Sequence, residues 1–380
     1  MNYASLKIKN TAASGSTTSS YMPTLDGWRA LAILCVMFTH NAVIHFGPLS
    51  TAWLYQNGHY GVDIFFAISG ILICTRLLHE EHRNGSISAR TFYLRRAFRI
   101  LPASFLYLFT LFLLSLFHLV AVSRGEWLGC LLFYRNYSHL VGSLPASGIT
   151  YTGHFWSLAV EEHFYFLLPG FMIFVRRKSW RIGILGATAF MVLGNRLIQL
   201  QSRSWDTIRF HTDVRLDSLL FAALLAIILY SGNEGKILRF LLRFWPVMLL
   251  ICFLVLTFLS VRVYSTLIPI CLPFVIFGSM RNTGSLSGLL LESPPLRFVG
   301  KVSYSLYLWQ TLFCVGHITS QHPLGIFQVW PINFLFAFSA AIASYYLVEK
   351  PMIRLGHKLA PSVVPGRLEF TSKKPVLVSS

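Results

Sequence analysis

Hydrophobic residues occur along this chain in long uninterrupted blocks rather than in alternation with polar ones. A helix needs roughly 20 mainly apolar residues to cross a bilayer, and about ten blocks approach that length. We place them at 29–45, 60–78, 100–121, 155–175, 182–200, 215–230, 244–260, 264–280, 302–320 and 330–349. A shorter stretch at 127–134 is typical of a re-entrant or interfacial piece. The blocks therefore predict an all-α fold, a polytopic integral membrane bundle of about ten transmembrane helices.

The composition agrees with that prediction and excludes other classes of protein. Of the 380 residues, 54% are hydrophobic and only 12% are charged, which excludes an ordinary water-soluble enzyme and a disordered chain. The net charge of +18 would suggest nucleic-acid binding in a soluble protein. With the N-terminus inside, however, ten spans place 25 of the 32 Lys and Arg residues on the inner side. This bias predicts cytoplasmic N- and C-termini, and no nucleic-acid partner is expected.

The same pattern defines one membrane domain between two polar ends. Residues 1–22 are rich in Ser and Thr and lack the apolar core of a secretory signal, so we expect a disordered cytoplasmic tail. The membrane domain is expected at 23–352, and 353–380 is expected to be a flexible cytoplasmic tail. The six cysteines stand apart, without CxxC or Cys/His spacing, so neither a disulfide framework nor a metal site is predicted.

Ionisable residues inside the predicted spans are the main candidates for function. Four spans bring such groups to the outer half of the bilayer: His40, Asp63, His154, Glu161, Glu162, Arg215 and Asp217. Charges at that depth are costly and need a partner, a water-filled cavity or a functional role. Simple structural roles are the alternatives: a packed histidine for His40, and pairing of the two glutamates with Arg215.

A cluster of arginines lies at the opposite, cytoplasmic side. Arg95, Arg96 and Arg99 begin the third span, and planar guanidinium groups suit the phosphates of a nucleotide-type ligand. Ordinary anchoring at the inner surface is the alternative. Arg29 and His40 share nearly one face of the first helix, about 16 Å apart along its axis. That face would run from the cytoplasmic surface toward the outer cluster.

Seven motifs in order along about 325 residues identify a resemblance to a known family. They are LDGWRALAILCVMFTH (25–40), GVDIFFAISGILI (61–73), RRAFRILPA (95–103), FWSLAVEEHFYFLLP (155–169), VRLDSLLF (214–221), SYSLYLWQ (303–310) and YYLVEKP (345–351). With them the chain resembles the membrane acyltransferase family 3. The bacterial members of that family transfer acyl groups to surface polysaccharides, lipopolysaccharide, peptidoglycan and exported small molecules.

The resemblance implies particular roles for particular residues. The family's first-helix arginine and histidine fall on Arg29 and His40, its RxxR arginines on Arg96 and Arg99, its fourth-helix glutamate on Glu161, and its later RxD-like block on Arg215 and Asp217. One departure is Gln310, where members commonly have a histidine; because its amide cannot exchange protons, we assign it no catalytic role. Some relatives carry a C-terminal esterase-like domain, for which this chain is expected to be too short.

These assignments predict acyl transfer across the membrane, from acyl-CoA to a hydroxyl of an extracytoplasmic carbohydrate or other surface or exported acceptor. The CoA phosphates would bind Arg96 and Arg99, assisted by Arg29. His40, with an ordinary pKa of about 6.5, would remove the acceptor proton while Glu161 or Asp63 holds its ring. Substrate or structural roles are expected for Trp156, Glu162, Arg215, Asp217 and Tyr304. No metal and no permanently bound cofactor are expected, and acetyl-CoA is the expected co-substrate.

Two other functions are compatible with the same residues. A proton-coupled transporter would also need acids and a histidine at membrane depth, and a non-catalytic membrane protein would need none of them. The family resemblance favours the enzyme and implies a bacterial inner membrane as its location. Neither the oligomeric state nor the identity of the acceptor follows from the residues.

Overall fold

The computed structural model describes residues 22–46, 49–137, 150–230, 235–281, 285–315 and 322–361, and helices dominate these ranges. The long helices are α1 (Pro23–Thr39), α3 (Gly61–Asn84), α4 (Ala89–Leu116), α7 (Phe155–Phe174), α8 (Lys178–Ser202), α10 (Thr212–Tyr230), α12 (Trp245–Phe258), α13 (Val261–Arg281), α15 (Pro294–Phe313) and α16 (Ile332–Ser344). Each of the ten predicted blocks overlaps one of these helices.

Short elements connect or extend the long helices. They are β1 (His45–Phe46), β2 (Leu49–Ser50), α2 (Ala52–Asn57), the 3₁₀ turn η1 (Gly58–Tyr60), α5 (Arg124–Leu131), α9 (Trp205–Ile208), α11 (Lys236–Arg243), α14 (Leu286–Leu291), the 3₁₀ turn η2 (Gly325–Gln328), the π-helical turn η3 (Tyr345–Glu349) and α17 (Lys350–Leu359). The two strands pair antiparallel. The apolar stretch at 127–134 overlaps α5, whose N-terminus Ser123 and Glu126 close as a capping box.

Within the described ranges, five helical segments are both long and apolar enough to cross a bilayer. They are Ala52–Asn84, Ala89–Leu116, Lys178–Ser202, Val261–Arg281 and Ile332–Leu359. The first joins α2, η1 and α3, and the last joins α16, η3 and α17. Apolar side chains on α4 remain exposed, Phe109 at 57% and Phe117 beyond its end at 73%, as expected for surfaces that face lipid. The predicted helical membrane protein is thus confirmed.

Several helix boundaries differ from the sequence prediction, among them those of the first and last helices. Helix α1 begins at Pro23 rather than near residue 29, because the fixed φ of proline suits the first helical position. At its other end α1 stops at Thr39, and His40 therefore lies at the C-cap. At the other end, α17 continues to Leu359, so the boundary predicted at 352 falls within a helix, with Pro351 tolerated in its first turn. The predicted tails lie otherwise outside the described residues, which end at 361.

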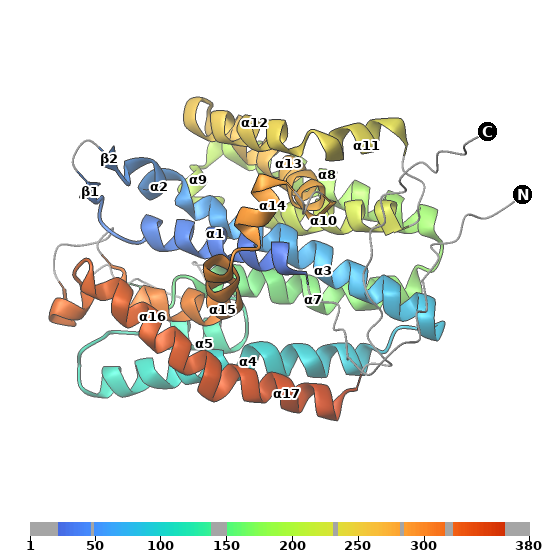
Figure 1. Ribbon diagram of the computed structural model, residues 1–380. Helices are drawn as coiled ribbons and strands as arrows, with labels where there is room; N and C mark the ends of the chain where they lie inside the picture. The colour runs from blue at the N-terminus through green and yellow to red at the C-terminus, as the bar shows by residue number, and fades with distance from the viewer. Residues whose placement is uncertain are drawn as a thin grey trace, which may run out of the picture.

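The centre of the bundle is formed by α1, α3, α10 and α15. Helix α1 packs along α15 and α3, and α10 packs along α3 and α8 (Figure 1). The closest approach is between α1 and α15, where Gly300 lies directly against the backbone of Asp26. In Figure 1 the end of α1, the two strands and α9 lie at one end of the bundle, and the turn between α3 and α4 lies at the other. The central helices therefore run between two ends of the bundle, and the polar residues at the two ends differ.

The contact at Gly300 gives a test of the fold. A Cβ at this position would overlap the carbonyl oxygen of Asp26, so Gly300→Ala should force α1 and α15 apart and lower the thermal unfolding temperature in detergent. The matched control is Gly170→Ala on α7, where nothing lies within 4 Å of the added carbon. That variant should be as stable as the wild type or more so, since alanine favours helix by about 1 kcal/mol. Equal unfolding temperatures for the two variants would contradict the close packing.

Candidate functional site: two adjoining chambers

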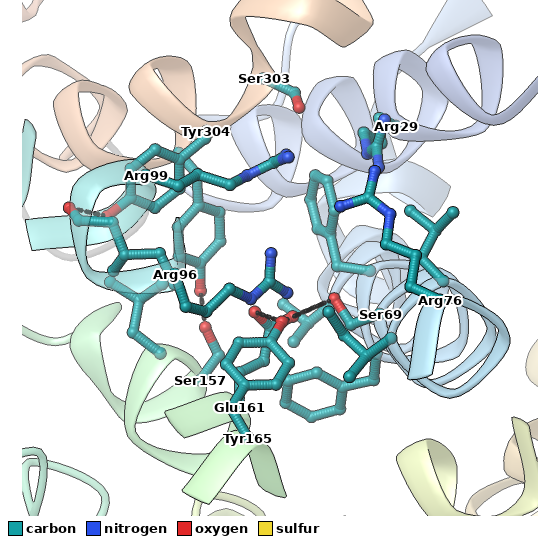
Figure 2. Close-up of a pocket in the computed structure, with 18 residues that line it drawn as sticks. Arg29, Ser69, Arg76, Arg96, Arg99, Ser157, Glu161, Tyr165, Ser303 and Tyr304 are labelled. Atoms are coloured by element: carbon teal, nitrogen blue, oxygen red, sulfur yellow. Dashed lines mark hydrogen bonds between the residues drawn. The ribbon is translucent and has the colours of Figure 1, made fainter. Parts of the chain in front are cut away.

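The first chamber is a cavity of about 90 Å³ whose polar lining is dominated by arginine. Its four guanidinium groups come from three helices: Arg29 on α1, Arg76 on α3, and Arg96 and Arg99 on α4. Figure 2 shows Arg99 and Arg96 pointing across the open centre toward Arg29 and Arg76. We call this cavity the arginine chamber.

The arginines of this chamber are largely without acidic partners. Arg29 donates to Asp26 at 2.8 Å, but Arg76, Arg96 and Arg99 form no ion pair with any acid in the described ranges. The guanidinium carbon of Arg96 lies 4.0 Å from the centroid of the Tyr165 ring. Low-dielectric walls around several like charges concentrate a positive potential. The chamber is therefore suited to a ligand that carries several negative charges.

Glu161 lies in this chamber and is held by two hydroxyl groups. Its carboxylate accepts hydrogen bonds from Ser69 at 3.0 Å and from Tyr165 at 2.7 Å. Tyr304 also lines the chamber and donates to the carbonyl of Ile100 at 2.8 Å, which ties α15 to α4. The structure thus gathers five predicted residues here: Arg29, Arg96, Arg99, Glu161 and Tyr304.

The second chamber is larger, about 450 Å³, and contains three histidines. His40 comes from the end of α1, His59 from η1, and His154 from the residue before α7. The rings of Trp156, Trp205 and Phe210 also line it. We call this cavity the histidine chamber. Aromatic faces beside hydrogen-bonding groups are suited to a ligand with both apolar and polar surfaces.

The two chambers adjoin one another at two residues. Val62 on α3 and Tyr307 on α15 line both cavities. The Tyr307 hydroxyl lies 2.6 Å from the Ser157 hydroxyl, so this contact connects α15 to α7 at the boundary. A ligand extending from one chamber to the other would pass these side chains.

Consecutive residues of α15 contact two of the histidines. His40 Nδ1 lies 3.0 Å from Gln310 Oε1, and His154 Nδ1 lies 2.9 Å from Thr311 Oγ1. His154 is only 4% exposed, and its Nε2 has no hydrogen-bond partner. Glu161 and Asp63 were the expected partners of the His40 ring, but Glu161 lines the other chamber and Asp63 pairs with Arg215. The described contacts of His40 include Gln310 instead.

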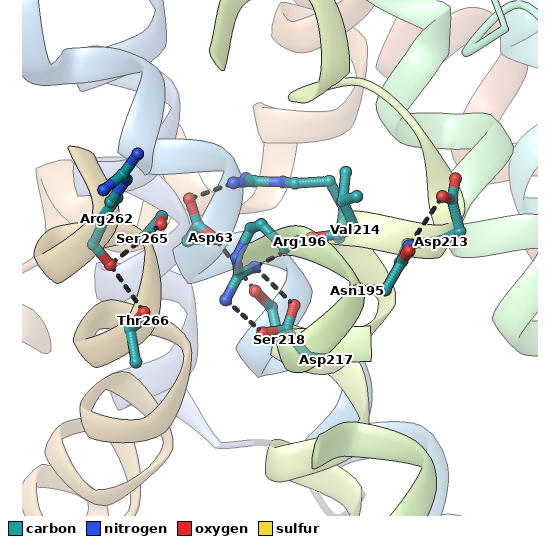
Figure 3. A network of polar contacts seen from close by, with 11 residues as sticks. Asp63, Asn195, Arg196, Asp213, Val214, Asp217, Ser218, Arg262, Ser265 and Thr266 are labelled. Carbon is teal, nitrogen blue, oxygen red and sulfur yellow. Dashed lines mark hydrogen bonds and ion pairs between the residues drawn. The ribbon is translucent and has the colours of Figure 1, made fainter. Parts of the chain in front are cut away.

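Asp63 and Asp217 belong to a buried network between α3, α8 and α10 (Figure 3). Asp63 accepts from Arg215 at 2.8 Å and from Ser218 at 3.0 Å. Asp217 accepts two hydrogen bonds from Arg196, at 3.1 and 2.8 Å, and both side chains of that pair are 0% exposed. These acids neutralise arginines within the bundle. Arg215 thus has the structural ion pair that was the alternative to a functional role, and its partner is Asp63 rather than a glutamate.

The remaining predicted residues fall beside these groups. Trp156 lines the histidine chamber, packs on Phe210 with ring centroids 5.2 Å apart, and lies 5.6 Å from the Arg215 guanidinium. Glu162 follows Glu161 but forms no hydrogen bond or ion pair with a described residue, and it lines neither chamber. No group of three or more metal-ligating side chains occurs in the part of the chain that the structure describes.

Sequence analysis missed two contributors to this site. Arg76 was counted only as a basic residue of the inner side, although its position within the apolar run ILICTRLL was a usable signal. Gln310 was noted as a departure and given no role. His154 was among the ionisable residues of the predicted spans, but its contact with Thr311 joins residues 157 positions apart and has no local signal.

Comparison with known proteins identifies a family. Residues 22–349 match the model of a family described as an acyltransferase domain. In Staphylococcus aureus strain NCTC 8325 / PS 47, the O-acetyltransferase OatA is 29% identical over 366 residues, which cover 89% of this chain and 58% of that protein. A protein of strain MSSA476 named "Putative O-acetyltransferase SAS0844" is 28% identical over 373 residues, covering 91% and 60%. The chain thus spans about 60% of the length of these relatives. No solved structure matches it.

The buried network provides a test of its structural role. Asp217→Leu would leave Arg196 charged and without its partner, and breaking such a buried pair costs about 3–5 kcal/mol. We expect a marked fall in the unfolding temperature in detergent. The double variant Arg196→Met/Asp217→Leu removes both charges and should recover most of the loss. A double variant no more stable than Asp217→Leu alone would show that the pair is not what stabilises this region.

Proposed function

The chain belongs to the acyltransferase family whose domain its residues 22–349 match, and on that premise we propose that it is a membrane O-acyltransferase. It transfers an acyl group, most simply acetyl, from cytoplasmic acyl-CoA to a hydroxyl of an extracytoplasmic carbohydrate or another surface or exported acceptor. The observation that carries this proposal is the pair of adjoining chambers. One is lined with four arginines, of which Arg76, Arg96 and Arg99 form no ion pair with a described acid, and the other contains a histidine at the end of the helix that carries the fourth, Arg29.

We propose ten membrane crossings with both termini in the cytoplasm, in a bacterial inner membrane. The support is the distribution of Lys and Arg, together with the ten helices that overlap the apolar blocks. In this orientation the arginine chamber opens toward the cytoplasm, where CoA is found, and the histidine chamber opens toward the outside. Residues 23–352 would form the catalytic membrane domain.

The donor would be recognised through its phosphates. Arg76, Arg96 and Arg99 offer planar, fixed donor geometry to several phosphate oxygens, and Arg29 adds a fourth positive group. The extended acyl arm would then pass Val62 and Tyr307, which border both cavities, and place its thioester in the histidine chamber.

The chemistry would be a single acyl transfer with His40 as general base. His40 takes the proton of the acceptor hydroxyl as that oxygen bonds to the thioester carbon. The carbon–sulfur bond breaks, and the departing thiolate receives the proton from the His40 imidazolium. The products are an ester and free CoA thiol, and His40 returns to its starting state.

The acceptor would bind among the aromatic rings of the histidine chamber. Trp156, Trp205 and Phe210 provide faces on which a sugar ring can pack. The relatives named O-acetyltransferases agree with an oxygen acceptor. The identity of the sugar and the position of the ester are not specified by these contacts.

His40→Ala tests the proposed base. In inside-out vesicles supplied with acetyl-CoA and a lipid and polysaccharide extract, wild-type protein should release free thiol and His40→Ala should release at least about 100-fold less. Membrane insertion should be unchanged, because His40 lies at the end of α1. Full activity of His40→Ala would eliminate the proposed base. Absence of thiol release by the wild type, with several acyl-CoAs and no CoA binding, would instead favour a transporter.

Arg76→Gln and Arg96→Gln test the proposed donor site. Each should raise the KM for acyl-CoA about tenfold or more, with a smaller effect on kcat, because the phosphates lie far from the reacting bond. Arg90→Gln is the matched control: this arginine is exposed near the start of α4 and lines neither chamber. An unchanged KM in both chamber variants would remove CoA from the arginine chamber.

A further inference from the structure

The contact between His40 and Gln310 joins two chain segments 270 residues apart. Gln310 lies in the last turn of α15 and is fully buried, at 0% exposure. Its backbone carbonyl also accepts the helix-ending hydrogen bond from Cys314 at 2.7 Å. The buried backbone fixes the position of this residue, and its side-chain oxygen faces the His40 ring.

The atom of Gln310 that faces His40 determines which ring nitrogen carries the proton. Its Oε1 can only accept a hydrogen bond, so His40 Nδ1 must donate, and the second ring nitrogen, Nε2, keeps its lone pair. Nε2 is then the atom able to take a proton. A histidine held through Nδ1 is the arrangement that a general base requires.

The nearby acids are already engaged with arginines. Asp63 pairs with Arg215 at 2.8 Å. Glu126 pairs with Arg135 at 3.1 Å, and Asp206 pairs with Arg209 at 3.4 Å. Among the described contacts, His40 Nδ1 is therefore paired with the Gln310 amide, which neither gains nor loses a proton.

We propose that Gln310 is a positioning residue for the acyl transfer: it holds His40 through Nδ1 and presents Nε2 as the base. This rests on the proposed function, in which His40 is the base. A carboxylate in the same place would also fix the ring, but it would favour the imidazolium form, which cannot accept a proton. Gln310 separates these two effects, since it orients the ring without adding charge.

The ionisable groups around His40 determine how clearly the effect of residue 310 on the pH dependence can be measured. The other ionisable groups that line the histidine chamber are His59 on η1, Arg135 after α5, His154 before α7, Asp206 and Arg209 at α9, and Arg215 on α10. Arg135, Arg209 and Arg215 are the paired arginines described above. A new carboxylate at position 310 would be the closest change in charge to His40, and its effect should dominate the pH dependence.

Two substitutions separate orientation from charge. Gln310→Glu keeps an acceptor but adds a negative charge, so the acidic limb of the profile of kcat/KM against pH should move to higher pH by about 1 unit. Gln310→Leu removes the acceptor and adds no charge. It should lower kcat about tenfold, leave the KM for acyl-CoA unchanged and leave the acidic limb in place. Gln201→Leu, exposed at the end of α8, is the matched control and should behave as wild type.

A nitrogen NMR measurement tests the proposal without any acceptor substrate. In protein labelled with ¹⁵N-histidine, the signals lost in His40→Ala identify His40. Wild-type His40 should carry its proton on Nδ1, and Gln310→Leu should give a mixture of the two tautomers. An Nε2-protonated ring in the wild type, or an unchanged tautomer in Gln310→Leu, would overturn the proposal.

The measurements also separate this inference from the proposed function. If the wild type turns over but Gln310→Glu has an unmoved pH profile, Gln310 is not a positioning residue although the enzyme assignment stands. If the wild type releases no thiol, the proposed function fails, and the NMR experiment still decides whether Gln310 sets the proton on His40.

Discussion

The close contact between α1 and α15 is the constraint on which both chambers depend. Gly300 lies against the backbone of Asp26, so no side chain separates the two helices at that point, and Gly27 lies against Leu291 at the end of α14, just before α15 begins. Helix α1 carries Arg29 into one chamber and His40 into the other, while α15 supplies Tyr304 to the first and contacts two of the three histidines of the second. Moving the two helices apart would disturb both cavities together.

The two chambers differ in how their charges are balanced. Around the histidine chamber, Asp63, Glu126 and Asp206 each pair with an arginine, so the positive groups there are neutralised by the protein. In the arginine chamber, Arg76, Arg96 and Arg99 have no such acids among the described residues. A membrane protein can maintain several like charges in a cavity only if water or an anionic ligand compensates them. The distribution therefore favours a polyanionic ligand in one chamber and a reaction involving neutral groups in the other.

This division of roles gives a physical reason for a protein that handles two substrates. In the proposed reaction, a charged donor and a hydroxyl acceptor would approach from opposite ends, and only the reacting atoms would need to meet, near Val62 and Tyr307. The relatives extend well beyond the region that this chain matches. Both chambers lie within residues 22–349, the region that matches the family.

The sequence by itself determined the helical membrane class, because long apolar blocks follow directly from the cost of placing polar groups in lipid. It also selected most of the charged residues that line the chambers, since each stands out against an apolar background. Only the tertiary structure decided their partners. Asp63 meets Arg215 across 152 positions and His40 meets Gln310 across 270, distances over which no local pattern operates. Gln310 could not be recognised from the sequence because an amide acquires its role from the atom it faces, and that depends on how α1 and α15 pack.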